Sequence, residues 1–112
     1  MTVEVSEPEM KVLIDPTAEL ERLAQGFMFT EGPVWDQANL WLYFSDIPAN
    51  TMYRYSGAKG AEVYRKPSNF SNGLTIDHQG WLIACEHQTH RVTREGKAVS
   101  YTHLTLPTTP YV

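Results

Sequence analysis

A repeat of about 40 residues is the feature that most limits what this chain can fold into. Residues 31–36 (EGPVWD) align with residues 72–77 (NGLTID) at an offset of 41, and residues 41–46 (WLYFSD) align with residues 81–86 (WLIACE) at an offset of 40. The one-residue difference falls in the turn between the two blocks, where chains tolerate deletions. Repeats of this length, made of short strands and Gly/Asn turns, are typical of β-propeller blades. The sequence therefore predicts an all-β fold.

Each repeat is expected to begin with a turn, followed by a short inner strand and a buried second strand. The turns are Glu31–Pro33 in the first repeat and Asn72–Gly73 in the second, because Gly, Pro and Asn favour tight bends. The tryptophans of the strands are expected to pack in the core rather than bind a ligand. The expected strands cover residues 34–35, 40–44, 51–55 and 62–65 in the first repeat, and 74–76, 81–85 and 91–94 in the second; the tryptophans are Trp35, Trp41 and Trp81.

The chain is too short for a closed propeller. Its 112 residues suffice for one small domain but hold only about two blades. A propeller works by closing its ring, and two blades leave open sheet faces and edges. We therefore expect either the front portion of a longer protein, which we favour, or a two-blade unit that assembles into a ring.

Glu31 and Asn72 occupy the same place in the two repeats, just before the expected inner strand. The inner strands of propeller blades line the central channel, so both side-chain oxygens are expected at one mouth of that channel. Converging oxygens suit a hard divalent cation such as calcium, which takes about six to eight oxygen ligands. The alternative is that both residues only hold turns. That alternative is strong for Asn72, because Asn-Gly is a common turn pair, and weaker for Glu31.

Several motifs resemble the gluconolactonase family, which includes senescence marker proteins and luciferin-regenerating enzymes. The resemblance runs from about residue 20 to about residue 96. It is specific at several places at once. Its motifs are FTEGPVW at 29–35, LYFSDI at 42–47, PSNFSNGLTID at 67–77, CEH at 85–87 and RVTR at 91–94.

This resemblance implies the first two blades of a six-bladed β-propeller, with a calcium-type metal on the central axis and hydrolysis of a sugar lactone. It makes Glu31 a metal ligand and sets Asn72 beside the metal as a substrate or ligand residue. Phe70 and Asn72 are expected to line the substrate mouth. The resemblance assigns the general base and the remaining ligands to blades beyond this chain, so the catalytic residue is unknown. We expect the 112-residue chain itself to be inactive and prone to aggregate at its open edges.

Two other classes of function remain open. A propeller can be a non-catalytic binding scaffold, because a fold does not determine a function. A self-assembling two-blade module is the other alternative. Zinc binding by residues 85–90 (CEHQTH) is disfavoured, because no second Cys/His pair completes a tetrahedral site. Glu86 and His87 are expected to form a polar rim or a salt link to Arg91 or Arg94. A serine hydrolase is disfavoured because the chain has no G-x-S-x-G motif.

Composition predicts a cytoplasmic protein that binds neither nucleic acid nor membrane. The net charge is −4 and no basic block occurs, which argues against nucleic-acid binding. No apolar run reaches the roughly 18 residues of a membrane span, and the acidic N-terminus lacks the features of a signal peptide. Cys85 is the only cysteine, so no intrachain disulfide can form.

The chain is expected to have three parts. Residues 1–19 form an N-terminal leader, and residues 20–98 form the partial gluconolactonase-like propeller. Residues 99–112 form a non-native tail, which is enriched in Thr and Pro and contains no Asp, Glu, Lys or Arg. Asp15 followed by Pro16 resembles a helix start and predicts one helical turn. Residues 20–25 show no clean periodicity, and the family resemblance favours a strand there.

Overall fold

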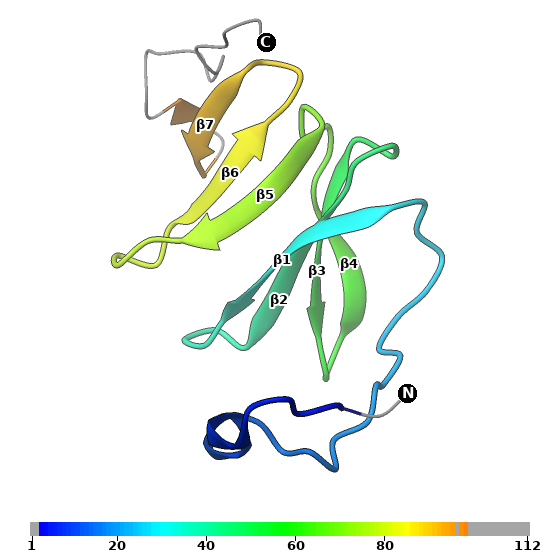
Figure 1. Cartoon of the computed structure of the whole chain (residues 1–112). Helices are drawn as coiled ribbons and strands as arrows, with labels where there is room; N and C mark the ends of the chain where they lie inside the picture. Colours follow the sequence, from blue (N-terminus) through cyan, green and yellow to red (C-terminus); the bar gives the residue numbers. More distant parts are fainter. Residues whose placement is uncertain (1–2, 96, 99–112) are drawn as a thin grey trace, which may run out of the picture.

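The chain forms two four-stranded antiparallel sheets, one from each repeat, in a computed structural model that describes residues 3–95, 97 and 98. Figure 1 shows the inner strands of the two sheets side by side where the sheets meet. A 3₁₀ helix, η1 (Pro8–Val12), precedes the sheets. The first sheet contains β1 (Thr30–Asp36), β2 (Trp41–Asp46), β3 (Thr51–Ser56) and β4 (Gly60–Arg65), and the second contains β5 (Ser71–Ile76), β6 (Leu82–Glu86), β7 (Arg91–Arg94) and β8 (Lys97–Ala98).

The hairpin turns confirm that the two sheets are structural repeats. The Asp36 carboxylate accepts hydrogen bonds from the amides of the turn after β1, and Asp77 does the same after β5. The positive φ angle of Leu40 before β2 recurs at Gly80 before β6, and that of Asn50 after β2 recurs at His90 after β6. The expected strands are therefore present, with β2 and β6 each shifted about one residue toward the C-terminus. Leu40, expected in a strand, lies in the turn instead.

The hydrophobic core lies between the two sheets. Tyr43 and Met52 from the first sheet pack against Leu82 and Ala84 from the second. Alternation along the strands explains this arrangement, because every second side chain of β2 and β6 faces the other sheet. Partly buried neighbours extend the cluster; they are Val34, Trp41, Tyr64, Leu74 and Ile76.

The prediction that all three tryptophans pack in the core is wrong for two of them. Trp41 borders the core and carries the Arg54 guanidinium 4.1 Å above its ring. Trp35 is 50% exposed and Trp81 is 47% exposed. Trp35 lies on the side of β1 that faces away from the second sheet, and Trp81 precedes β6, so neither can reach the core between the sheets.

The N-terminal segment differs from its prediction. Asp15 does not start a helix; its carboxylate accepts hydrogen bonds from the amide and hydroxyl of Thr17 and closes a local turn. Residues 20–28 form no regular strand, because they form no ladder with β1–β4. The five-residue η1 buries none of its side chains. Among the described residues, no helix is long and apolar enough to cross a membrane.

Two buried carboxylates stand at equivalent strand ends and hold the chain that enters each inner strand. Asp46 accepts hydrogen bonds from the amides of Met28 and Phe29. Glu86, which is 3% exposed, accepts one from the Asn69 side chain and pairs with Arg91 at 3.2 Å. The predicted salt link of Glu86 is thereby confirmed for Arg91. Arg94 pairs with Asp77 instead, with 3.8 Å between Arg94 Nη1 and Asp77 Oδ2.

A tyrosine joins the outer part of the first sheet to the second. The Tyr64 hydroxyl donates a 2.8 Å hydrogen bond to Glu95, whose other oxygen accepts one from the Leu82 amide. Burial and the adjacent Glu95 carboxylate raise the pKa of Tyr64 to about 12 from an ordinary 10.0. The fold therefore favours the protonated phenol.

Tyr64 predicts a loss of stability at high pH. Because its pKa is raised on folding, its contribution is present below pH 10.0 and is lost as the pH rises toward about 12. We expect the difference in unfolding free energy between wild type and Tyr64→Phe to change across this window. Denaturant titrations of both proteins at matched pH values measure it. A difference that does not change with pH would contradict the assignment.

Candidate functional site

Glu31 and Asn72 lie in two equivalent β-bulges, not in turns before the strands as predicted. In β1 the register against β2 shifts between Glu31 and Val34, and in β5 it shifts against β6 between Ser71 and Leu74. A bulge adds one residue to a strand, bends it and redirects the side chains beside it. Both segments are thus strand and not turn, because hydrogen bonds to the neighbouring strand continue on either side.

The two bulges are in direct contact through Gly32. This residue has φ +67°, and a Cβ placed on it would overlap the carbonyl oxygen of Asn72 and come within 3.3 Å of the Gly73 Cα. Only glycine allows the two backbones to approach this closely. The structure therefore brings the equivalent site residues Glu31 and Asn72 onto neighbouring strands at the junction of the sheets, as Figure 1 shows for β1 and β5.

Two buried serines hold this junction together, and sequence analysis did not identify them. The hydroxyls of Ser45 and Ser71 lie 2.9 Å apart, and Ser45 also donates to the Asn72 carbonyl oxygen at 3.2 Å. Both serines are fully buried. Ser45 opposes Glu31 across β1 and β2, so it links the first bulge to the second. The only signal in the sequence is that a serine ends the apolar run of β2.

The side chains at the junction offer oxygen atoms of the kind that a hard cation binds, but too few of them to complete its coordination. Glu31 offers an exposed carboxylate, and Asn72 offers an amide oxygen that accepts a 2.6 Å hydrogen bond from the Gly73 amide. Calcium prefers such oxygens but takes about six to eight of them. The described residues contain no group of three or more His, Cys, Asp or Glu side chains that could hold a metal. His87 and His90, the candidates for zinc, have ring centroids 6.0 Å apart.

Phe70 directly precedes the second bulge and is fixed by its backbone. Its amide donates a 2.8 Å hydrogen bond to the Asn50 side chain, and its carbonyl oxygen accepts one from the His87 amide. Its φ of 54° is unusual for a bulky residue and requires such support. Phe70 lies two residues before Asn72, at the end of β5 where that strand begins.

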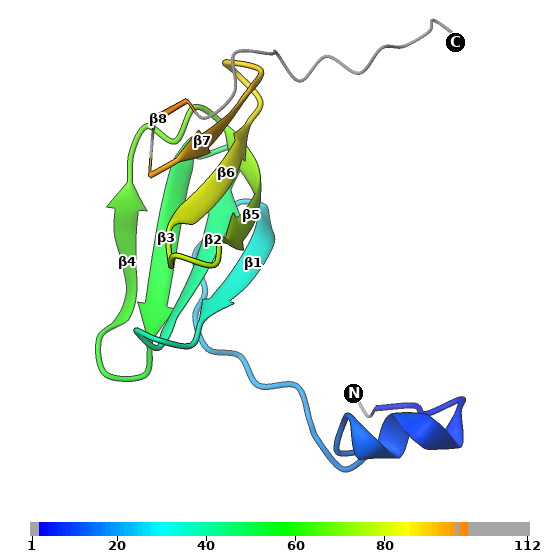
Figure 2. The ribbon, with the colours of Figure 1, turned by 90° about the vertical axis from the view of Figure 1, so that its left-hand side faces the viewer.

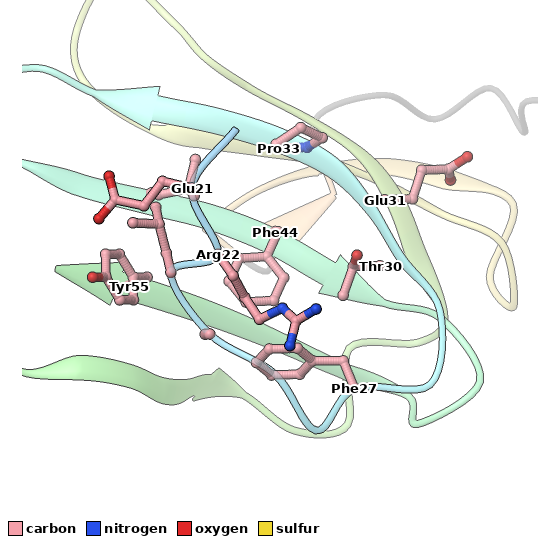
Figure 3. Close-up of a pocket in the computed structure, with 11 residues that line it drawn as sticks. Glu21, Arg22, Phe27, Thr30, Glu31, Pro33, Phe44 and Tyr55 are labelled. Carbon is pink, nitrogen blue, oxygen red and sulfur yellow. The ribbon is translucent and has the colours of Figure 1, made fainter. Parts of the chain in front are cut away.

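A groove of about 380 Å³ lies beside the first bulge, on the side of the first sheet that faces away from the second. Figure 3 shows Phe27 and Phe44 inside it and the Glu31 carboxylate pointing away from both rings. Phe27 packs edge-on against Phe44 at 5.1 Å. The groove is mainly apolar, and Glu31 stands at its border; the other lining residues are Glu21, Arg22, Leu23, Ala24, Thr30, Pro33, Leu42 and Tyr55.

Fold and site together define a protein of repeated four-stranded antiparallel sheets whose inner strands meet at a polar junction. Comparison with protein families identifies the class: residues 29–110 match the SMP-30/gluconolactonase/LRE-like region. The match covers most of the chain, so the chain belongs to this family. The resemblance noted in the sequence is thereby confirmed.

Individual relatives agree with this assignment. A gluconolactonase from Zymomonas mobilis is 26% identical over 100 residues, which covers 78% of this chain. A structural-genomics target presented as a candidate gluconolactonase superposes with a TM-score of 0.69 at 38% identity over 80% of the chain. A gluconolactonase from Xanthomonas campestris superposes with a TM-score of 0.59 at 29% identity over 61% of the chain. The chain spans only 28%, 31% and 23% of the lengths of these three proteins.

Proposed function

We propose that this chain is part of a metal-dependent lactonase that hydrolyses a sugar lactone. Membership of the gluconolactonase family is the observation that carries the proposal. The relative from Zymomonas mobilis and the structural relative from Xanthomonas campestris are both described as gluconolactonases. A sugar lactone is accordingly the small-molecule substrate class that we propose.

We further propose that the two sheets are the first two blades of a six-bladed propeller. The equivalent bulges, turns and buried carboxylates of the two sheets support a repeating blade. The strand order is sequential within each sheet, and the first strands β1 and β5 are neighbours, as expected for strands that line a central channel. Two blades are one third of a six-bladed propeller. This fraction agrees with the share of its relatives' length that the chain spans.

In the proposed site Glu31 would hold a divalent metal, with calcium favoured by the oxygen chemistry of the junction, and Asn72 would contribute a further oxygen or contact the substrate. When bound there, such a cation would supply Lewis-acid stabilisation of negative charge on a lactone carbonyl oxygen. The Glu31 carboxylate points away from the apolar groove. Ser45 and Ser71 keep the Asn72 backbone in place, so Asn72 needs little reorganisation when it acts.

Phe70 is proposed to form one wall of the substrate mouth. Its backbone is tied to Asn50 and His87, so its ring is presented from a rigid element. An aromatic wall can pack on the apolar face of a sugar ring while Asn72 bonds to its hydroxyls. The general base, which takes a proton from the attacking water, is not assigned to any residue of this chain.

Substitution of the proposed metal ligand tests the function. In a longer protein that contains this segment, Glu31→Gln is expected to lower kcat/KM for glucono-lactone by about 10–100-fold, because it removes a charged ligand. Excess calcium is expected to restore part of the activity. The control is Glu62→Gln on β4, which removes a carboxylate paired with Arg54 away from the junction. Equal activity of the two variants would refute the role of Glu31.

The 112-residue chain alone is expected to show no lactone hydrolysis above the rate in buffer. It supplies about two of the six to eight oxygens that calcium takes. Turnover by this chain that Glu31→Gln abolishes would show instead that two sheets suffice.

A further inference from the structure

Phe29 is an exposed aromatic residue to which the proposed function gives no role. It lies two residues before Glu31, the proposed metal ligand. Phe70, the proposed wall of the substrate mouth, lies two residues before Asn72, and the repeat offset of 41 makes the two phenylalanines equivalent. The first sheet therefore carries a counterpart of Phe70 at the start of its own inner strand.

Backbone hydrogen bonds show the same equivalence. The carbonyl oxygen of Phe29 accepts a 3.2 Å hydrogen bond from the Ile47 amide, and that of Phe70 accepts one of 3.2 Å from the His87 amide. Ile47 directly follows β2 and His87 directly follows β6, the strands that pair with the two inner strands. Both phenylalanines are thus tied to the neighbouring strand in the same way.

The backbone of Phe29 is fixed although its ring remains largely uncovered. Asp46, which is 1% exposed, accepts hydrogen bonds from the amides of Met28 at 2.9 Å and Phe29 at 3.1 Å. With the bond from Ile47, both backbone polar groups of Phe29 are satisfied. The ring itself is 61% exposed. Because the backbone is already ordered, a ligand that covers this ring removes little conformational entropy.

Phe27, two residues earlier in the chain, serves the packing of the first sheet instead. Its ring packs against Phe44 and Tyr53. The chain then bends at Met28, and Phe29 belongs neither to the hydrophobic core cluster nor to the lining of the groove. Packing among the described residues therefore does not account for an aromatic side chain at position 29.

Strand alternation places Phe29 on the side of β1 that carries Glu31. Thr30 pairs with Asp46, and the bond from Ile47 continues this antiparallel pairing to Phe29. Successive side chains of a strand point to opposite sides, so Phe29 lies on the side of Glu31 and opposite Thr30. Thr30 lines the groove, whereas Figure 3 shows the Glu31 carboxylate pointing away from it. The exposed ring is thus a neighbour of the proposed metal ligand.

The two phenylalanines lie at the same end of the junction. Figures 1 and 2 show β1 and β5 running in the same direction, and the bulge at Gly32 touches the Asn72 backbone. The residues just before these strands are therefore at one end, one on each sheet. Phe70 has φ 54° and Phe29 has no positive φ, so the two rings leave the backbone at different angles.

A neighbouring sheet does not bury this position of the repeat. Phe70 has the first sheet beside it and is still partly exposed. Packing of one sheet on the next therefore leaves the equivalent aromatic position accessible at the end of the junction. The exposure of Phe29 follows from its place in the repeat.

We propose that Phe29 is a specificity-determining residue that packs on the apolar face of the lactone ring, beside Glu31. The inference rests on the proposed lactonase function and deepens it, because it assigns the mouth a second aromatic contact in addition to Phe70. Aromatic rings bind the C–H face of a sugar ring while polar groups bind its oxygens. The two phenylalanines would therefore select cyclic esters that present an apolar ring face.

Steady-state kinetics in a longer protein that contains this segment test the proposal. Phe29→Ala is expected to raise KM for glucono-lactone by about 5–20-fold and to keep kcat within about 2-fold of wild type. The reason is that a wall packs equally on the substrate and on the transition state. Phe29→Tyr keeps the ring face and is expected to restore KM. The calcium concentration for half-maximal activity should not change, because Glu31 is untouched.

The control is Val63→Ala on the outer strand β4, which removes another exposed apolar side chain and should keep the wild-type KM. Thermal unfolding of all variants separates a structural role from a contact with substrate, since a structural role lowers the melting temperature and leaves KM unchanged.

The outcomes distinguish the two proposals. A wild type without lactone hydrolysis would refute the proposed function and this inference with it. An active wild type, combined with a Phe29→Ala variant whose KM equals that of Val63→Ala, would refute the inference alone. A loss of kcat at unchanged KM, or a shifted calcium dependence, would also overturn it, because the residue would then act through the metal site.

Discussion

Gly32→Ala is expected to lower the free energy of unfolding by about 2–4 kcal/mol, the range of strongly destabilising substitutions. An alanine there must adopt φ +67°, and its Cβ would overlap the carbonyl oxygen of Asn72. Both groups are backbone, so neither can move aside as a flexible side chain would. The two sheets must separate locally, which also displaces the junction that carries Glu31 and Asn72.

The second repeat contains a matched control for this experiment. Gly73 occupies the equivalent place in β5, has no strained φ, and offers space for a Cβ next to Cys85. Gly73→Ala is expected to change the unfolding free energy by no more than about 1 kcal/mol. Chemical denaturation of both variants measures the difference. Equal losses would show that the bulges, rather than the contact between the sheets, need glycine.

Glu86→Ala is expected to destabilise the chain by about 2–3 kcal/mol, the upper part of the range for leaving buried hydrogen-bonding groups without a partner. Asn69, Thr89, Thr93 and Arg91 all donate hydrogen bonds to this carboxylate. Its loss leaves them without their acceptor and frees the loop that leads into β5. Glu62→Ala, which breaks the partly exposed pair with Arg54, is the control and should cost no more than about 1 kcal/mol.

The Glu86 carboxylate also leads us to expect that the stability of the fold depends on pH in the acid range. Burial would raise the pKa of Glu86, but the hydrogen bonds from Thr89, Asn69, Thr93 and Arg91 outweigh it and lower the pKa below its ordinary value of 4.5. A lowered pKa means that the stabilisation is present above pH 4.5 and is lost as the pH falls below it. Glu86→Gln should therefore flatten the fall in stability in acid. An unchanged pH profile would contradict the assignment.

Local patterns in the sequence predicted much of the fold. The repeat, most of the strands and the hairpin turns within each sheet could be predicted from neighbouring residues, and the structure confirms them. The equivalence of Asp36 and Asp77, for example, follows from the aligned blocks and reappears as two turns closed by the same carboxylate hydrogen bonds. Family membership was likewise visible in these motifs, because they are short and contiguous.

The site was predicted only in part. The alignment correctly paired Glu31 with Asn72, but it assigned both to turns, since Gly, Pro and Asn occur in turns and in bulges alike. The serines of the junction escaped notice because Ser45 and Ser71 are 26 residues apart and meet only across two sheets. The metal-binding role of Glu31 and the substrate roles of Phe70 and Asn72 remain proposals.

The sequence by itself determined the repeat, most of the strands and the hairpin turns, because these depend on the preferences of neighbouring residues. Only the tertiary structure decided which sides of the sheets meet. Alternation identifies the two sides of a strand but does not say which side a neighbouring sheet will cover. Packing of the second sheet on Tyr43 and Met52 left Trp35 exposed, and it made Gly32 the point where the two bulges touch.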